Sequence, residues 1–307
     1  MSETPRDDAW TVAEEALLAP FLREQLPGQA YNAIKRMVTT GKITVNGAAE
    51  TRPTAKLRPG ALVALHMATP RATDRPSVRI VYEDPHVVVI DKPSGVSSVP
   101  YHEGERATAI DLIRDAWRKR GISEQGPLHV VHRIDKETSG LLVFARTKLA
   151  ERVLQTQLRA HEMDRVYRCV VHGEAKSTRI ESVLVDDRGD GLRGTARTAE
   201  QRRRGKRAVT HVTAIRTFAC CTECEVRLET GKTHQIRIHL SELGHPLVGE
   251  KVYIRDWARD GHAAVPSPRL LLHAATLGFV HPVGGHTVSL SSELPQDWLS
   301  AVAAIGG

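Results

Sequence analysis

Charged side chains gather in one short stretch, HRIDKETSG (residues 132–140), which lies between two apolar runs. Functional groups often project where a strand gives way to a loop. A carboxylate at such a place can act as a nucleophile at a sugar carbon if a nearby arginine or lysine keeps it ionised. Asp135 is therefore a candidate nucleophile. The local sequence leaves open that Asp135 only caps the turn, by accepting hydrogen bonds from the amides of Thr138 or Ser139.

Arg237 is a candidate partner for such a carboxylate. In the segment RLETGKTHQIRIHLSELGHP, a strand is expected to end at Gly231, and Thr233 can cap the helix that follows. A cation in the first turn does not help the helix dipole, because the N-terminus of a helix favours anions. We therefore expect Arg237 to have a partner such as a buried carboxylate, the alternative being an arginine that reaches solvent. The sequence alone does not pair Arg237 with Asp135.

Tyr167 lies within an apolar strand, between Arg165 and Arg168, in the segment DRVYRCVVHG. The commoner role of a tyrosine in this setting is to fill the core. The functional alternative is a ring that stacks on a nucleobase and a hydroxyl placed for proton transfer. Both interpretations stay open at this point.

Other familiar chemistries lack their motifs. His234 and His239 are five positions apart, not four as in a helical zinc pair, and Cys221 and Cys224 have CxxC spacing without a second ligand pair. No GxxxxGK[ST] occurs, and no GxGxxG follows a strand, which argues against nucleoside triphosphate chemistry. No GxSxG elbow supports a serine hydrolase.

Composition indicates a folded protein with an anionic partner as one option. The chain has 307 residues, of which 41% are hydrophobic, and a formal charge of +7. The sequence contains no run of about 18 apolar residues, so we expect no membrane span. The acidic, polar start of the chain does not resemble a secretory signal. The four cysteines are expected to be reduced, as in a cytoplasmic protein.

Two domains are expected. Residues 11–66 form a small module with two helical patterns, a short strand, an Asn46-Gly47 turn and a further strand. Residues 67–77 are polar and rich in proline and threonine, as a linker would be. Residues 78–307 form an α+β domain, because short apolar runs often follow one another directly, which favours a mixed, largely antiparallel sheet.

Helices interrupt these strands at four places: ATAIDLIRDAWRKR, KLAERVLQTQLRAHEM, KTHQIRIHLSELG and PQDWLSAVAAI. The run LHVVHRID is expected to be an apolar strand that ends in charge. Residues 186–207 are rich in glycine and basic residues, and we expect an exposed loop or hairpin there. On composition this segment is either solvated or in contact with phosphates.

Five segments together resemble the RluA family of RNA pseudouridine synthases. They are VYEDPHVVVIDKPSG, HRIDKETSGLLVFARTK, RVYRCVVHG, RLETGKTHQIRIHLSELGHPLVGEKVY and LLHAATLGFVHP. They follow the order of the family's motifs across residues 80 to 300, so the resemblance covers the whole large domain. It implies the family's catalytic domain, with helices flanking its sheet, and it favours the nucleophile over the turn cap for Asp135.

The small module resembles an S-four-type RNA-binding domain. The segment IKRMVTTGKITVNGAAETRPTAKLRPG fits the helix, turn and strand pattern of that domain, whereas the opening EEALLAPFL departs from its usual basic start. Lys35, Arg36 and Lys42 are the best candidates for phosphate contacts, since basic side chains supply most sequence-independent affinity for RNA.

The resemblance implies isomerisation of uridine to pseudouridine in RNA, without cofactor or metal. The base would leave its stack, and Arg133 would occupy the vacated place. Asp135 would attack the ribose, or promote loss of uracil with formation of a glycal, before the uracil turns and bonds again through carbon 5. Tyr167 would stack on the base and, in the glycal route, take the proton from ribose carbon 2. Arg237 would keep Asp135 ionised and oriented.

The remaining expectations concern the pocket and the partners. Lys232, His234 and Gln235 would shape the pocket and, with Thr138, bind substrate, although Lys232 stands where the family more often has a planar arginine fork. The loop at residues 251–268 is longer than in the family and bears on substrate choice. The expected partner is RNA, large-subunit ribosomal RNA first and transfer RNA second. A cytoplasmic monomer with no obligatory protein partner would suffice.

Two other functions compete with this one. A non-catalytic RNA-binding or ribosome-assembly protein on the same fold would bind RNA tightly and would still function after Asp135→Ala. A nucleoside hydrolase that uses the same carboxylate would release free uracil. The presence of HRID, the tyrosine and HQIR together argues against the first, because binding alone has no need of an ionised aspartate beside an anionic partner.

Overall fold

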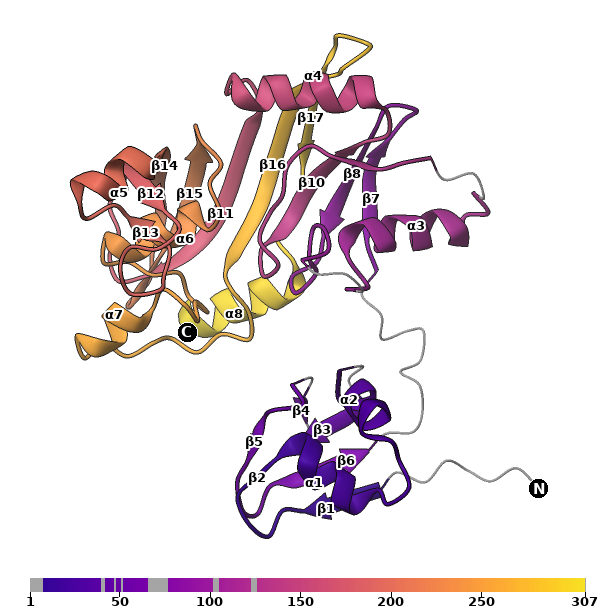
Figure 1. Cartoon of the computed structure of the whole chain (residues 1–307). Helices are drawn as coiled ribbons and strands as arrows, with labels where there is room; N and C mark the ends of the chain where they lie inside the picture. The colour runs from indigo at the N-terminus through magenta and orange to yellow at the C-terminus, as the bar shows by residue number, and fades with distance from the viewer. Residues whose placement is uncertain are drawn as a thin grey trace. The chain divides into compact units, whose positions relative to one another are not determined.

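The computed structural model describes residues 8–39, 42–46, 48–50, 52–65, 77–101, 105–122 and 126–306. The chain divides into two compact units, residues 1–75 and 76–307 (Figure 1), and each is described by itself. Apart from Ser77, the linker expected at residues 67–77 lies outside the described residues. None of the described helices is both long enough and apolar enough to span a lipid bilayer.

The smaller unit packs two helices against short strands. Its described strands form an antiparallel sheet in the order β1-β6-β3-β4, and β2 pairs with β5. Leu22 of the first helix and Ile34 of the second are completely buried with Val63 of the sheet. The first helix begins at Leu18, directly after Ala16 and Leu17, which pair with β5. The elements are β1 (Asp8–Thr11), β2 (Ala16–Leu17), α1 (Leu18–Gln25), α2 (Tyr31–Thr39), β3 (Ile43–Val45), β4 (Ala48–Ala49), β5 (Lys56–Leu57) and β6 (Leu62–Leu65).

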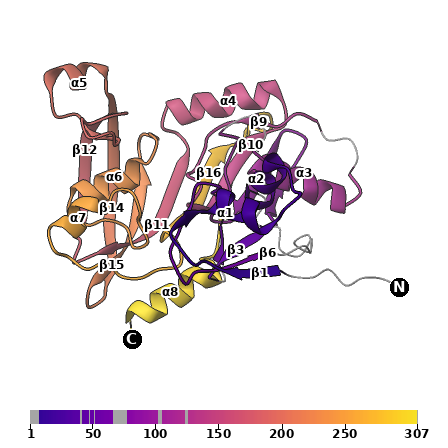
Figure 2. The same ribbon diagram turned by 60° about the horizontal axis from the view of Figure 1, so that its bottom comes forward.

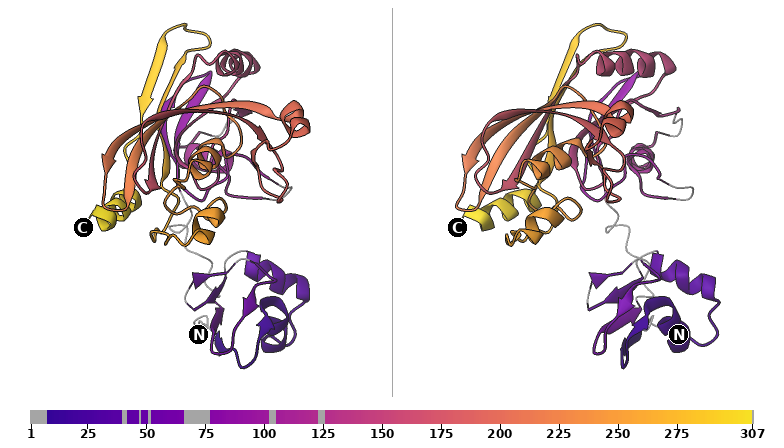
Figure 3. Two further views of the ribbon diagram at one scale, coloured as in Figure 1. Left: turned by 90° about the vertical axis from the view of Figure 1, so that its left-hand side faces the viewer. Right: turned by 60° about the vertical axis from the view of Figure 1, so that its left-hand side comes forward.

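The larger unit is built on one long, curved sheet (Figure 3). Its main path runs β13-β12-β14-β15-β11-β16-β10-β8-β7, with β17 beside β16 and β9 beside β10. The strands are β7 (Arg79–Glu83), β8 (Val87–Lys92), β9 (His129–Val130), β10 (Ser139–Ala145), β11 (Asp164–His172), β12 (Thr178–Val185), β13 (Gly194–Thr195), β14 (Lys206–Thr217), β15 (Cys221–Leu228), β16 (Leu272–Val280) and β17 (Thr287–Ser291). Within the described residues, β10 and β16 are the one parallel pair. The α+β class with a mixed, largely antiparallel sheet is confirmed.

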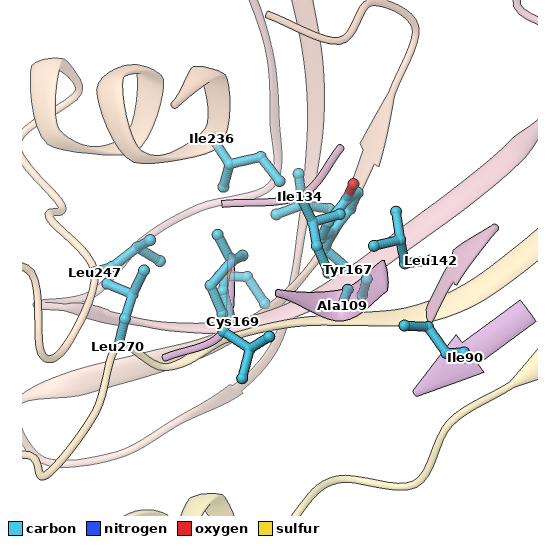
Figure 4. Close-up of a cluster of buried hydrophobic side chains, with 14 of the residues drawn as sticks. Ile90, Ala109, Ile134, Leu142, Tyr167, Cys169, Ile236, Leu247 and Leu270 are labelled. Atoms are coloured by element: carbon cyan, nitrogen blue, oxygen red, sulfur yellow. The ribbon is translucent and has the colours of Figure 1, made fainter. Parts of the chain in front are cut away.

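Helices cover both faces of this sheet. They are α3 (Ala109–Lys119), α4 (Lys148–Arg159), α5 (Ala199–Arg204), α6 (Gln235–Glu242), α7 (Arg255–Arg259) and α8 (Gln296–Gly306). Side chains alternate along each strand, so Ile90 and Leu142 lie in the cluster on one face of the sheet (Figure 4). Trp117 of α3 belongs to the same cluster. Val89 packs with Leu154 of α4 on the other face.

The parallel contact between β10 and β16 depends on Gly140. Its φ is 108°, and a Cβ at this position would lie 2.3 Å from the carbonyl oxygen of Ala274. Only glycine allows so close an approach of the two main chains. Ala274 in turn pairs with Tyr167 of β11. Gly140 thus fixes where the loop before β10 meets the centre of the sheet.

Several expectations need correction. Of the run LHVVHRID only His129 and Val130 form a strand, because they pair with the far end of β10 and the chain then leaves the ladder. Residues 186–207 were expected to be a loop or hairpin; β13 does form a hairpin with β12, but the helix α5 was not expected. The loop expected at residues 251–268 contains the helix α7. The four helices expected in the large domain are confirmed as α3, α4, α6 and α8.

Candidate active site

Lys92 anchors the loop that carries Asp135. Its ammonium is completely buried and donates to three main-chain oxygens, those of Pro93 (3.0 Å), Val96 (2.7 Å) and Lys136 (3.1 Å). The loop is thereby tied to the segment DKPSG. Burial lowers the pKa of the Lys92 ammonium to about 7, against the opposing charge of Asp135. No functional role for Lys92 was inferred from the sequence, although DKPSG was one of the matching motifs.

Replacing Lys92 with methionine should loosen this loop. Three buried carbonyls would lose their donor, and each unsatisfied group costs about 1–3 kcal/mol. We expect a fall of about 3 kcal/mol in the free energy of unfolding, measured in urea. A depressed lysine pKa means that the unfolded chain binds the extra proton, so wild-type stability gains from Lys92 as pH rises from about 7 towards 10.5. That gain should be absent in Lys92→Met, and an equal pH dependence in both proteins would contradict the assignment.

Asp135 presents its carboxylate to solvent and to the guanidinium of Arg237. The turn after it is closed by the main chain, since the amide of Thr138 donates to the carbonyl oxygen of Asp135 at 3.1 Å. The side chain of Asp135 is 22% exposed and lies 3.7 Å from Nη1 of Arg237. The Asp135 carboxylate is therefore not the cap of this turn, and the turn does not consume its charge.

Arg237 is held by a buried carboxylate that sequence reasoning missed. Its Nε and Nη2 donate to Glu250 at 2.8 and 2.7 Å, and the Glu250 side chain is completely inaccessible. The same guanidinium lies 3.7 Å from both Asp135 and Glu137. Burial alone would lower the pKa of Arg237, but the hydrogen bonds and charge of Glu250, followed by the charge of Asp135, raise it above its usual value. Arg237 is thus a permanent cation beside Asp135.

The start of α6 differs from the expectation. His234, not Thr233, occupies the N-cap position, with φ of 57° and no side-chain capping bond. Gln235 replaces the cap as the anchor: its Oε1 accepts from Thr230 and from the amide of Lys232, and its Nε2 donates to β14. All four of these bonds stay inside the protein, so Gln235 positions the helix. Nδ1 of His234 lies 2.8 Å from the hydroxyl of Tyr253.

A cavity of about 1050 Å³ brings together every site residue predicted in the large domain. Among the described residues that line it, Asp135 is the one carboxylate. The predicted residues there are Asp135, Tyr167, Arg237, Arg133, Thr138, Lys232, His234 and Gln235. The lining arginines and lysine are Arg133, Arg159, Arg165, Arg193, Arg207, Arg237 and Lys232. Such a surplus of cations attracts a polyanion.

Tyr167 forms part of the floor of this cavity. The residue is 7% exposed, and its ring packs beside Ile134 with the hydroxyl directed away from Cys169 (Figure 4). Burial raises the pKa of the phenol, the charge of Arg165 lowers it, and that of Asp135 raises it, for a net increase. Within the described residues no group hydrogen-bonds to this hydroxyl, which is therefore neutral and free to bond a ligand.

Arg165 and Arg133 are two arginines of the cavity with open hydrogen-bonding capacity. Arg165 is 7% exposed, and its buried Nε has no partner among the described residues. It lies two residues before Tyr167 on β11 and so shares the same face, a signal that strand alternation offered. Arg133 is exposed and has no ion-pair partner in the part of the chain that the structure describes. Both can contact phosphate or base.

The candidates in the smaller unit lie on and after α2. Lys35 and Arg36 are exposed on this helix, and the ammonium of Lys35 lies 4.8 Å from the ring centre of Tyr31. Lys42 follows the helix and is half-buried. An RNA contact for these three residues stays a prediction.

Comparisons with known proteins agree with this site. Residues 86–242 match the family model of RNA pseudouridylate synthase. The ribosomal large subunit pseudouridine synthase D of Zymomonas mobilis is 35% identical over 86% of this chain and 86% of its own length. That of Yersinia pestis is 32% identical over 96% of this chain and 93% of its own length.

Solved structures support the fold. Human RNA pseudouridylate synthase domain containing 4 matches 74% of this chain and 92% of its own length, with a TM-score of 0.57 at 21% identity. The resemblance drawn from the five motifs of the large domain is confirmed, whereas the comparisons do not bear on the S-four-type module. The chain belongs to the RNA pseudouridylate synthase family and is an RNA pseudouridine synthase.

Proposed function

We propose that this enzyme isomerises specific uridines in structured RNA, with large-subunit ribosomal RNA as the first substrate and transfer RNA as the second. One observation carries the proposal: among the described residues, a single carboxylate, Asp135, faces a cavity rich in cations. Cationic side chains bind the negatively charged phosphates of an RNA backbone. A carboxylate among them opposes binding, so its presence is best explained by a reaction. The names of the relatives from Zymomonas mobilis and Yersinia pestis favour ribosomal RNA.

Asp135 would act on the ribose of a flipped uridine. The carboxylate either bonds to ribose carbon 1 or assists departure of uracil with formation of a glycal, and the uracil then returns through carbon 5. Arg237 holds the aspartate ionised from 3.7 Å. The exposed Arg133 would fill the space that the base leaves, while Arg165, Lys232 and Thr138 contact the nucleotide.

Tyr167 would stack on the uracil and move a proton. Because the pKa of its phenol is raised, the neutral hydroxyl can accept the proton from ribose carbon 2 only if it passes its own proton on at the same time. Asp135, whose charge acts on this phenol, is the acceptor that we propose.

Replacing Tyr167 with phenylalanine separates the two roles of this residue. The ring would still stack, and the core would stay packed, but proton transfer would be lost. We expect the single-turnover rate to fall by about 10²–10⁴, the usual contribution of general acid–base catalysis, with RNA affinity unchanged. An unchanged rate would rule out an essential hydroxyl.

The smaller unit would supply additional RNA affinity as an S-four-like domain. Lys35, Arg36 and Lys42 would contact phosphates without reading sequence. In keeping with a ribosomal substrate, we propose that the enzyme works as a monomer in the cytoplasm.

Incubation of the purified full-length protein with unmodified large-subunit ribosomal RNA tests the proposal. The expected products are pseudouridine at one or a few positions and no free uracil, measured by nuclease digestion and mass spectrometry. Free uracil would favour a hydrolase. Tight binding of this RNA without any isomerisation would instead favour a ribosome-assembly role.

A further inference from the structure

Residues 186–207 form a basic arm at one edge of the large sheet. The arm comprises β13 and α5. The strand β13 is the edge strand of the sheet, and α5 lies at one end of β12 (Figure 2). It contains eight arginines and lysines and four acidic residues. The family match extends across this segment. Arg193 and Arg207 of the arm also line the large cavity, whereas the activity derived above gives no role to its other cations.

The acidic side chains of the arm are already engaged. Asp186 pairs with Arg193, Asp187 accepts from the amides of Gly189 and Gly191, and Glu200 pairs with Arg204. Asp190 bonds two further arginines.

Four cations of the arm remain unpaired: Arg197, Arg202, Arg203 and Lys206 are exposed, and no described carboxylate pairs with them. Arginines without acidic neighbours at a surface indicate a negatively charged partner.

The arm is fixed to the catalytic helix α6 by a buried arginine. Arg188 is 7% exposed and contacts Asp190 within the arm (3.0 Å), Glu242 at the end of α6 (3.4 Å) and Asp256 of α7 (3.1 Å). Glu242 also accepts from the amide of Thr195 at 3.0 Å. A buried arginine that is paired with carboxylates of the arm, α6 and α7 restrains these segments relative to one another, because a buried cation left without a partner is costly. The free cations therefore keep a defined position relative to Arg237, which α6 also carries.

A second cavity joins the arm to the active site. It has a volume of about 220 Å³, and Lys206 and Arg193 of the arm line it together with Lys232. Arg193, Lys232 and two further residues line the large cavity as well. The charged residues that line the second cavity are cations, apart from Asp186, which is paired with Arg193. A ligand bound on the arm would therefore adjoin the substrate bound in the large cavity.

We propose that the arm is a second RNA-binding surface, which holds phosphates of nucleotides that flank the target uridine. Arg193, Lys206 and Lys232 would bind the nearest phosphates, and Arg197, Arg202 and Arg203 more distant ones. The continuity with the substrate cavity favours RNA over an acidic protein. This inference rests on the proposed function. The contacts supply affinity that offsets the cost of unstacking the base, a few kcal/mol.

A matched pair of double variants tests the arm. Arg202→Gln with Arg203→Gln removes two cations from the last turn of α5, and Arg118→Gln with Lys119→Gln removes two from the last turn of α3. Both pairs are exposed, so the loss to each helix dipole is similar.

The probe is unmodified large-subunit ribosomal RNA, with the dissociation constant measured by filter binding at several salt concentrations. For the arm variant we expect about tenfold weaker binding and a slope of log affinity against log salt that is shallower by about one to two units. The α3 variant should match wild type. Single-turnover rates at saturating protein should stay within about twofold of wild type for both, because neither pair touches the reacting atoms.

Two results would overturn the inference. Equal RNA affinity and equal salt slope in the two double variants would mean that the arm serves a partner other than RNA, such as an acidic protein. A loss of rate at saturation without a loss of affinity would assign the arm to structure. Failure of the proposed function is a different result, since wild-type protein would then form no pseudouridine, whereas the binding comparison would still decide the role of the arm.

Discussion

Asp135→Asn is expected to abolish pseudouridine formation while the protein folds and binds RNA much as before. Asparagine has the same shape but no nucleophilic oxygen, and the turn at Asp135 is closed by the main chain. The fold therefore does not depend on the carboxylate. We expect the single-turnover rate to fall at least about a thousandfold, equivalent to ~4 kcal/mol of barrier, with the urea midpoint within experimental scatter of wild type.

Glu137→Gln is the matched control for this variant. Glu137 lies on the same loop, 3.7 Å from the same guanidinium, but it does not line the cavity. Its loss should change the rate by less than about threefold, or ~0.7 kcal/mol. Residual activity of Asp135→Asn within about tenfold of wild type, a change of only ~1.4 kcal/mol in the barrier, would contradict the assignment of Asp135 as the nucleophile.

Arg237→Met should be costly to both stability and activity. The substitution leaves Glu250 completely buried and without its cation, and breaking a buried pair in this way costs about 3–5 kcal/mol. Asp135 would also lose the guanidinium 3.7 Å away. We expect the free energy of unfolding in urea to fall by that amount and the single-turnover rate to fall at least about a hundredfold, or ~2.7 kcal/mol.

A double variant separates these two effects. In Arg237→Met with Glu250→Gln no charge is left buried, and the amide oxygen of the substituted side chain can still accept from the main-chain amides of residues 251 and 252, as Glu250 does. At least half of the lost stability should return, while activity should stay low. Recovery of wild-type activity in the double variant would mean that Arg237 acts on Glu250 alone and not on Asp135.

The contribution of Glu250 to the pH dependence of stability should change sign when Arg237 is replaced. In wild type, burial opposes ionisation of Glu250, but the hydrogen bonds and charge of Arg237 outweigh it and set the pKa below the usual 4.5. This carboxylate therefore stabilises the fold above pH 4.5, and the contribution is lost as pH falls through the lowered pKa.

Without Arg237, burial dominates, and the pKa of Glu250 should lie above 4.5. Arg237→Met should therefore become less stable relative to wild type as the pH rises through that raised pKa. Urea unfolding at pH 5 and pH 8 checks this. An equal difference between the two proteins at both values would contradict it.

The sequence identified the candidate residues of the site but not the groups that hold them in place. Asp135, Tyr167 and Arg237 were selected by motif and by their place in strand or helix, and one cavity joins them. Glu250 could not be paired with Arg237, because a separation of 13 positions in the sequence gives no register between them. The anchor formed by Lys92 likewise depends on main-chain oxygens, one of them 44 residues away, and main-chain oxygens carry no signal in the side-chain pattern.

Local rules failed where tertiary contacts replaced them. Thr233 has the chemistry of a cap, yet Gln235 anchors the start of α6 to β14 and leaves His234 in the left-handed region. The arm was expected to be a loop or hairpin, without a helix, because glycine and arginine dominate its composition. Thr198 nevertheless starts a helix there by a capping box with Gln201.

Pseudouridine mapping of ribosomal RNA from cells with and without this gene tests the central claim most directly. We expect pseudouridine to disappear from one or a few large-subunit positions in the deletion strain, to return with the wild-type gene and to stay absent with Asp135→Asn. An unchanged large-subunit map in the deletion strain would contradict the proposed substrate. Restoration by Asp135→Asn would contradict the proposed chemistry.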